Sequence, residues 1–217
     1  MPRKSNSPVA AARLVPLNAG LNAVREAARS CRACDLWKRG TQTVFGEGAR
    51  HAQILFVGEQ PGDKEDLQGR PFVGPAGAVL DRALKAAGID RRQTYVTNAV
   101  KHFKWEPRGK RRIHKKPNSL EIAACRAWLD AEIELVRPEV IVCLGATAAQ
   151  ALLGRDFRVT RQRGELLPFD AAPYILATVH PSAILRAQTD EDRHREMDRF
   201  IADLRVVAEL LQQRKAA

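Results

Sequence analysis

The chain of 217 residues is 45% hydrophobic and 28% charged, which is enough for one substantial core and lies near the upper size of a single domain. Its 36 Lys and Arg against 25 Asp and Glu give a formal net charge of +11, which favours a polyanionic partner such as nucleic acid. No apolar run approaches the roughly 20 residues of a membrane span, and the first residues lack a continuous apolar signal region. We therefore expect a cytoplasmic protein with no membrane partner, and a monomer because nothing in the sequence suggests a larger assembly.

The chain opens with small, polar and basic residues interrupted by proline, so we expect a flexible lead-in over 1–16 and a single domain over 17–217. Leu17, Leu21, Val24 and Ala28 recur at helical spacing and predict a first helix. Strand and helix patterns then alternate. The predicted strands are 53–58, 94–98, 139–145 and 174–181, the predicted helices are 74–88, 119–136, 146–154 and 190–213, and 163–169 is expected to form a small edge hairpin.

This alternation predicts an α/β fold, because each parallel crossover needs a return of helix length. We expect a three-layer α/β/α sandwich with a central four-stranded parallel sheet. Ligands of such folds bind beyond the carboxyl ends of the strands. In this chain those ends carry Gly58-Glu59-Gln60, Asn98, Gly145 and His180.

The segment 58–77, GEQPGDKEDLQGRPFVGPAG, has five glycines that would let its backbone approach a flat or anionic ligand. It matches neither a Walker loop nor a dinucleotide fingerprint, and a plain turn-rich connection is the simpler alternative. Phe72 within it has two interpretations: it stacks on a base, or it is ordinary core.

Most of the net charge lies in one segment. Residues 101–116 hold eight Lys or Arg and one Glu, and so carry +7 of the +11. We expect residues 101–117 to form a basic insert loop between the second strand and helix 119–136, across the mouth of the proposed pocket. The stretch KRRIHKK (110–116) alone is compatible with a phosphate-binding arm or a localisation signal, and its His114 with a solvated neighbour of cations.

Four cysteines in an intracellular chain, two of them in CRAC at Cys31 and Cys34, indicate metal ligands or redox groups rather than a disulfide framework. From the ligand types alone, a zinc site of three cysteines and one histidine fits as well as an iron–sulfur cluster.

Three segments together resemble a known family. GEQPGDKEDLQGRPFVGPAG, TNAVKH (97–102) and HPSAILR (180–186) are similar to signature segments of the iron–sulfur uracil-DNA glycosylases of families four and five. The inserted KRRIH resembles the UdgX branch of that superfamily. The likeness spans about residues 31–210 and implies the uracil-DNA glycosylase fold, with uracil-containing DNA as the partner.

The resemblance implies a uracil pocket in which Phe72 stacks on the flipped base, Asn98 reads its edge and His180 lies by O2. An amide suits the pyrimidine edge because it offers a donor and an acceptor together. The substrate-binding residues that the resemblance implies are Gly58, Gln60, Asp63, Phe72, Asn98 and His180. We expect single-stranded DNA to be preferred, because no base pair is then broken.

UdgX-like proteins become covalently attached to the DNA from which they excise uracil, and the resemblance assigns this role to His114. Glu59 is expected to orient that imidazole, and Ile113 to anchor the segment. The implied catalytic residues are therefore His114, Glu59, Gln60 and His180. The implied DNA contacts are Lys110, Arg111, Arg112, Lys115, Ser182 and Arg186. A glycosylase that turns over without capture and a non-catalytic nucleic-acid-binding module are the alternatives.

The resemblance also implies a structural [4Fe–4S] cluster held by Cys31, Cys34 and Cys125. Where family four has a Lys-Cys pair, this chain has Lys101-His102. The fourth ligand is therefore expected to be His102, with Cys143 as the alternative. Cys143 lies in an apolar strand, where a cysteine is more simply a small buried hydrophobe.

Overall fold

The computed structural model describes residues 11–216, so most of the lead-in expected at 1–16 lies outside the described residues. The expected first helix begins later than its apolar spacing indicated. Helix α2 spans Leu21–Ala28, whereas the Leu17 side chain is 93% exposed. No helix among residues 11–216 is long and apolar enough to span a membrane.

A central sheet has its strands in the order β1-β3-β2-β6-β8-β7. The four expected parallel strands are confirmed at β3, β2, β6 and β8, and the sheet extends beyond them. Short antiparallel strands β1 and β7 pair with the two edges, so the sheet is mixed and six-stranded rather than parallel and four-stranded. The bounds are β1 Glu47–Gly48, β2 Ile54–Gly58, β3 Thr94–Asn98, β6 Val140–Leu144, β7 Leu166–Phe169 and β8 Ala172–Thr178.

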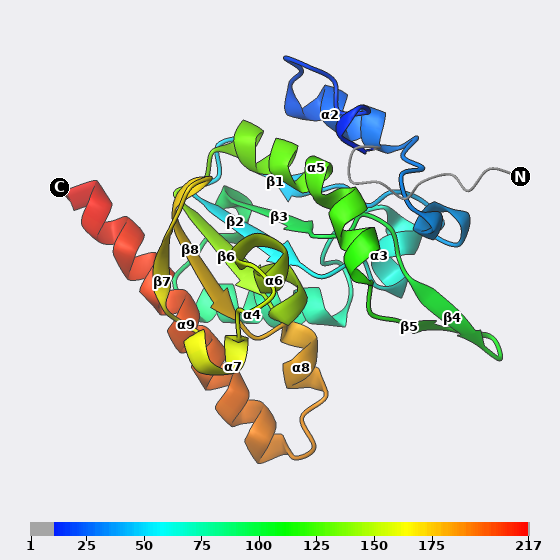
Figure 1. Ribbon diagram of the computed structural model, residues 1–217. Helices are drawn as coiled ribbons and strands as arrows, with labels where there is room; N and C mark the ends of the chain where they lie inside the picture. Colours follow the sequence, from blue (N-terminus) through cyan, green and yellow to red (C-terminus); the bar gives the residue numbers. More distant parts are fainter. Residues whose placement is uncertain (1–10, 217) are drawn as a thin grey trace, which may run out of the picture.

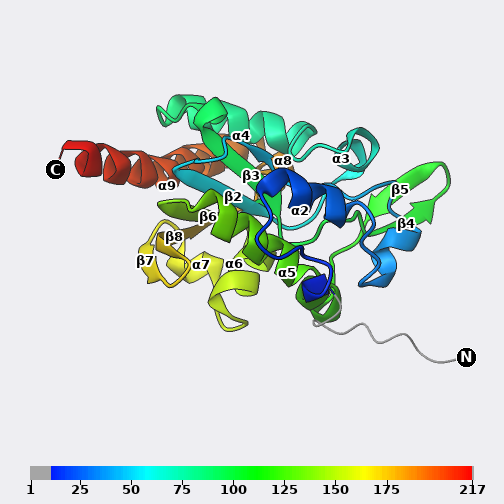
Figure 2. The same ribbon diagram turned by 90° about the horizontal axis from the view of Figure 1, so that it is seen from above.

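Helices cover both faces of the sheet (Figures 1 and 2). One layer contains α2, α5 (Ser119–Val136), α6 (Ala146–Leu153) and the short α7 (Val159–Gln162). The opposite layer contains α4 (Pro75–Ala86), α8 (Pro181–Leu185) and α9 (Asp190–Ala216). The remaining helices are α3 (Asp63–Gln68), η1 (Asp35–Lys38) and η2 (Arg91–Gln93). The predicted three-layer α/β/α sandwich is confirmed.

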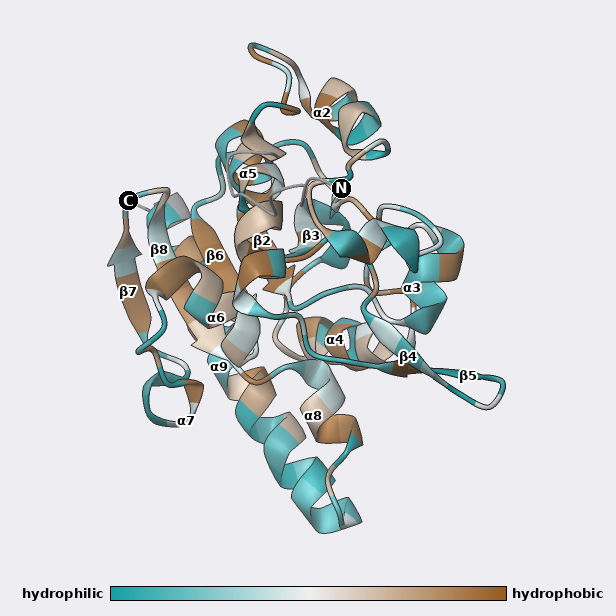
Figure 3. Ribbon diagram, turned by 45° about the vertical axis from the view of Figure 1, so that its right-hand side comes forward, coloured by the Kyte–Doolittle hydropathy of each residue, from teal (hydrophilic) through white to brown (hydrophobic). Residues whose placement is uncertain are grey.

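Strands β2 and β6 are hydrophobic throughout because both of their faces are buried. In β2, Leu55 and Val57 face the layer of α5, whereas Ile54 and Phe56 face the layer of α4 and α9. Figure 3 shows β2 and β6 as hydrophobic and the N-terminal part of α9 as hydrophilic. Helix α5 begins with the expected capping box: the Asn118 side chain accepts the Glu121 N–H, and the Glu121 side chain accepts the Asn118 N–H.

The basic segment is not a loop. Its residues form a separate two-stranded antiparallel hairpin, β4 (Trp105–Arg108) and β5 (Arg111–His114), which projects from the body beside α3 (Figure 1). Gly109 at its tip has φ 58°, a conformation that tight hairpin turns require and that glycine adopts without steric cost. Its strands are rich in charged residues and do not alternate apolar and polar side chains, so the pattern that marks a strand is absent.

Candidate active site

A cavity of about 1030 Å³ opens at the carboxyl ends of the parallel strands, as the fold predicts. The polypeptide brings together there residues that lie far apart in the sequence. The predicted site residues that line it are Glu59, Gln60, Asp63, Phe72, Asn98, His114, His180, Ser182 and Arg186. Lys110, Arg111, Arg112 and Lys115 lie outside this lining, on the hairpin.

Phe72 forms one wall of the cavity in an unusual backbone conformation. Its φ is 56°, which an aromatic residue rarely adopts, and its side chain is 8% exposed. Two glycines make room for it: a Cβ on Gly58 would lie 2.7 Å from the Phe72 ring, and a Cβ on Gly77 would overlap the Phe72 carbonyl. The ring stacks against the His180 imidazole with a centroid distance of 6.2 Å. Strain held in this way at a pocket wall is typical of a binding position.

Asn98 is the last residue of β3 and lies opposite Gly58 of β2, only 3% exposed. Its side-chain oxygen occupies the space that a Cβ on Gly58 would take, so glycine is required there. Lys101 Nζ donates to the Asn98 backbone carbonyl, but no described residue hydrogen-bonds the side-chain amide of Asn98. A buried amide with unused donors and an acceptor at a cavity wall is suited to a polar ligand.

His180 follows β8 and faces the cavity as a neutral imidazole. Burial lowers its pKa to about 4. The Glu59 carboxylate opposes this shift and the Arg186 guanidinium adds to it, both by smaller amounts. Its Nδ1 accepts the Ser182 N–H at 3.1 Å, so in the neutral ring the proton resides on Nε2. The neutral imidazole can therefore donate one hydrogen bond, from Nε2.

Glu59 joins the sheet to the hairpin. Its Oε1 lies 3.3 Å from His114 Nε2, and its Oε2 accepts the hydroxyl of Thr147, from the start of α6. Burial raises the pKa of Glu59, but the hydrogen bonds from His114 and Thr147 outweigh it, so the pKa lies below its usual value. The expected Glu59–His114 pair is therefore present, with an ionised carboxylate holding one ring nitrogen.

Gln60 holds the base of the hairpin. Its amide donates to the carbonyls of Lys104 and Lys115 at 3.2 and 3.1 Å, and its oxygen accepts the Lys104 N–H at 3.3 Å. The contacts of Gln60 are thus to backbone at the mouth of the cavity.

Two residues of the basic segment have contacts that differ from those expected. Arg112 donates to Asp63, Asp66 and Thr41 rather than presenting its guanidinium to solvent. Ile113, expected to anchor the segment, is 37% exposed. Lys110 and Arg111 are exposed, and Lys115 pairs at the surface with Glu106 at 2.9 Å.

The cysteines fall into two groups. Burial raises the pKa of Cys34 to about 11 and that of Cys125 to about 12, and the neighbouring cysteines add to both increases, so Cys31, Cys34 and Cys125 lie near one another. The pKa of Cys143, on the central strand β6, is raised by burial alone. The Trp128 indole donates to Cys31 Sγ at 3.2 Å, and the Lys101 N–H to Cys125 Sγ at 3.4 Å.

His102 is 5% exposed and adjoins this region through Lys101. Its Nε2 contacts the Thr43 hydroxyl at 3.0 Å, whereas its buried Nδ1 has no partner among the described residues. Among the described residues, no three His, Cys, Asp or Glu side chains converge closely enough to hold a single metal ion. A four-iron cluster takes one ligand per iron and so needs a wider ligand set. Three buried thiols and an unpaired buried imidazole nitrogen fit that donor set.

Comparison with known proteins decides the family. A model of the Uracil DNA glycosylase superfamily matches residues 45–205. The chain is 40% identical over 171 residues to a Type-4 uracil-DNA glycosylase of Thermotoga maritima, covering 78% of this chain and 85% of that relative. The chain belongs to the uracil-DNA glycosylase superfamily.

Other relatives in the superfamily extend the likeness. A Type-4 uracil-DNA glycosylase of Archaeoglobus fulgidus is 39% identical over 171 residues, covering 75% of this chain and 82% of the relative. A Type-5 uracil-DNA glycosylase of Pyrobaculum aerophilum is 29% identical over 177 residues, covering 74% of each chain.

For this superfamily member, sequence reasoning missed several residues that build the site. Thr147 gave only a weak signal, a hydroxyl two residues after Gly145, the glycine that follows β6. Thr41 and Asp66 gave none, because the segments that carry them meet Arg112 only in the folded chain.

Proposed function

We propose that this protein excises uracil from DNA and is then captured on the resulting abasic sugar through His114. The observation that carries the capture step is the 3.3 Å contact between His114 Nε2 and Glu59 at the mouth of the cavity. Similarity to Type-4 uracil-DNA glycosylases supports the excision step.

In the proposed excision step, a uracil flipped out of the strand enters the cavity and stacks on Phe72. The Asn98 amide pairs with its O4 and N3–H edge, and His180 Nε2–H donates to O2. The bond between the sugar C1′ and uracil N1 breaks, and its electron pair leaves with the base. A hydrogen bond to O2 stabilises the uracil anion, so a neutral donor at this position accelerates its departure.

In the proposed capture step, a lone pair of the His114 imidazole forms a bond to the cationic C1′. The positive charge passes to the imidazole, whose other nitrogen keeps its proton hydrogen-bonded to the Glu59 carboxylate. Holding the nucleophile beside the carbon lets it compete with water. Uracil leaves as the anion and the alkylated imidazolium remains, so charge and electrons balance.

We propose that Lys110, Arg111 and Lys115 on the hairpin, and Ser182 and Arg186 from α8, contact the DNA backbone. Arg186 Nη1 donates to Ser182 Oγ at 3.0 Å, so these two act together at the cavity rim. Single-stranded DNA is the proposed preferred substrate and a monomer the acting form.

We further propose that Cys31, Cys34, Cys125 and His102 hold a [4Fe–4S] cluster with a structural role. The cysteines come from the segment after α2 and from α5, and His102 from the segment after β3. The group would cross-link these parts beside the hairpin. The buried Nδ1 of His102, which has no partner among the described residues, and the place of Cys143 within the apolar strand β6 support His102 as the fourth ligand.

The test uses the purified protein and a labelled single-stranded oligonucleotide with one uracil. After boiling in detergent, a denaturing gel is expected to show a shifted band with the wild type. His114→Ala should give no shifted band and a free abasic product, and a thymine oligonucleotide neither. Free abasic product from both proteins, with no shifted band, would reduce the function to a glycosylase with turnover. Salt-sensitive binding without any product would indicate a binding module.

A further inference from the structure

Hairpin β4–β5 carries His114 yet pairs with no strand of the central sheet. An isolated two-stranded hairpin is only marginally stable in water. His114 stays 3.3 Å from Glu59 only if contacts outside the hairpin hold it in place. The structure assigns those contacts.

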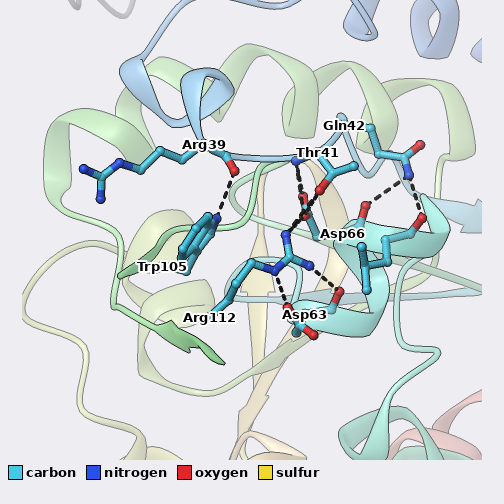
Figure 4. Close-up of polar contacts among 8 residues, drawn as sticks. Arg39, Thr41, Gln42, Asp63, Asp66, Trp105 and Arg112 are labelled. Atoms are coloured by element: carbon cyan, nitrogen blue, oxygen red, sulfur yellow. Dashed lines mark hydrogen bonds and ion pairs between the residues drawn. The ribbon is translucent and has the colours of Figure 1, made fainter. Parts of the chain in front are cut away.

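The Arg112 guanidinium connects β5 to helix α3 (Figure 4). Its Nε donates to Asp63 Oδ1 at 2.5 Å and its Nη1 to Asp66 Oδ2 at 2.6 Å, while Nη2 donates to the Asp63 carbonyl at 3.2 Å. Asp66 is fully buried, and it also accepts the Thr41 N–H at 2.9 Å and the Thr41 hydroxyl at 2.6 Å. The buried carboxylate is therefore oriented independently of the hairpin.

Aromatic contacts surround the same guanidinium. It lies 5.4 Å from the centroid of Phe103 and 5.6 Å from that of Trp105. The Trp105 indole donates to the carbonyl of Arg39 at 2.9 Å, which attaches β4 to the segment after η1 (Figure 4). Both strands of the hairpin are thus attached to the body of the protein.

The alternation of β5 links this anchor to the reactive side chain. Arg112 and His114 are two residues apart and project from the same face, whereas Arg111 and Ile113 project from the other. Fixing Arg112 against α3 therefore turns His114 toward the cavity. The Phe103 ring lies between them, 6.1 Å from the His114 ring.

The charges argue against a phosphate as the partner of Arg112. Its side chain is 20% exposed, and Nε, Nη1 and Nη2 each donate to a protein acceptor. A phosphate would have to displace two carboxylates, one of them fully buried, and leave that charge without its cation. Exposed Lys110 and Arg111 have no such competitors among the described residues.

We infer that Arg112 is a positioning residue for covalent capture: its ion pairs with Asp63 and Asp66 fix the hairpin so that His114 meets the sugar carbon. The inference rests on the proposed function and deepens it. Arg112 acts through the hairpin and contacts neither the base nor the sugar. It replaces the phosphate contact that the sequence suggested for this residue.

The test compares Arg112→Ala with Arg108→Ala, which removes the same charge from an exposed position on the same hairpin. Free uracil and boiling-resistant adduct are measured in one reaction on the uracil oligonucleotide. Arg112→Ala is expected to lower the rate of adduct formation by about 10²-fold, as for a displaced reactive group, and uracil release much less. Arg108→Ala should keep the wild-type ratio of adduct to released uracil.

Two further variants sharpen the result. Arg112→Lys should restore the ratio only in part, because one ammonium cannot bridge two carboxylates as a planar guanidinium does. As a single substitution, Asp63→Asn should lower the ratio of adduct to released uracil. Added to Arg112→Ala it should lower the ratio by less than it does alone, because the two side chains form one contact.

An unchanged ratio in Arg112→Ala would overturn the inference. An equal fall of uracil release and adduct, with a weaker salt dependence of DNA binding, would assign Arg112 to phosphate instead. If the wild type releases uracil without any adduct, the proposed capture fails. Hydrogen exchange of the backbone amides of residues 104–115 then tests independently whether Arg112 anchors the hairpin. Faster exchange in Arg112→Ala than in Arg108→Ala supports it, and equal exchange overturns it.

Discussion

At the scale of single residues, neighbouring side chains in the segment after β2 make contacts with different parts of the site. Glu59 contacts the His114 imidazole, Gln60 holds the hairpin backbone, and Asp63 pairs with Arg112. One short stretch of chain therefore contributes both to the lining of the cavity and to the contacts that hold the hairpin. A change in this turn should affect base binding and the position of His114 together.

His180 gives a prediction about pH. Its pKa is lowered from 6.5 to about 4, mainly by burial, while Glu59 opposes and Arg186 and His114 support the shift. Between these values the unfolded chain binds a proton that the folded chain does not, so this residue makes stability rise with pH. Urea unfolding should show a larger gain from pH 5 to pH 7 in the wild type than in His180→Gln. Equal gains would contradict a buried neutral imidazole.

At the scale of elements, the entry to α4 fixes the base-stacking wall. Gly77, in the first turn of α4, lies directly against the backbone of Phe72. A Cβ added at Gly77 would meet backbone atoms of Phe72, so no movement of a flexible side chain could relieve the clash.

Gly77→Ala should therefore destabilise the protein by about 1–3 kcal/mol, the usual cost of overpacking, and slow uracil release by moving Phe72. Urea unfolding and release of labelled uracil measure the two effects. Gly20→Ala is the matched control, because its new Cβ would meet its nearest neighbour at 3.7 Å, an ordinary contact. Similar losses in both variants would show that the close approach of Gly77 has no special role.

At the scale of the whole molecule, the net charge of +11 is unevenly distributed. The hairpin concentrates cations at the cavity mouth, while many other Arg side chains pair with carboxylates, as along the start of α9. The field that attracts DNA should therefore be strongest where the base must enter.

Replacing Lys110 and Arg111 by alanine should weaken single-stranded DNA binding and reduce the slope of log K against log salt by about 1.4, at about 0.7 per phosphate contact. Fluorescence anisotropy over a salt series measures the slope. Arg82→Ala with Lys85→Ala removes the same charge from α4, whose C-terminal end lies near the start of β2 and β3, away from the cavity. A fall in slope as large for this pair would mean that net charge alone directs binding.

The sequence by itself determined the parallel core, its two helical layers, the capping box of α5 and the meeting of Asn98 and His180 at one edge. Each depends on local periodicity or on the rule that parallel strands end at the same edge. The hairpin, the two antiparallel edge strands and the partners of Arg112 were decided only by tertiary structure. Arg112 and Lys110 cannot be distinguished within a basic run of sequence. Asp66 lies 46 positions before Arg112, and only folding brings this buried carboxylate to Arg112 and not to Lys110.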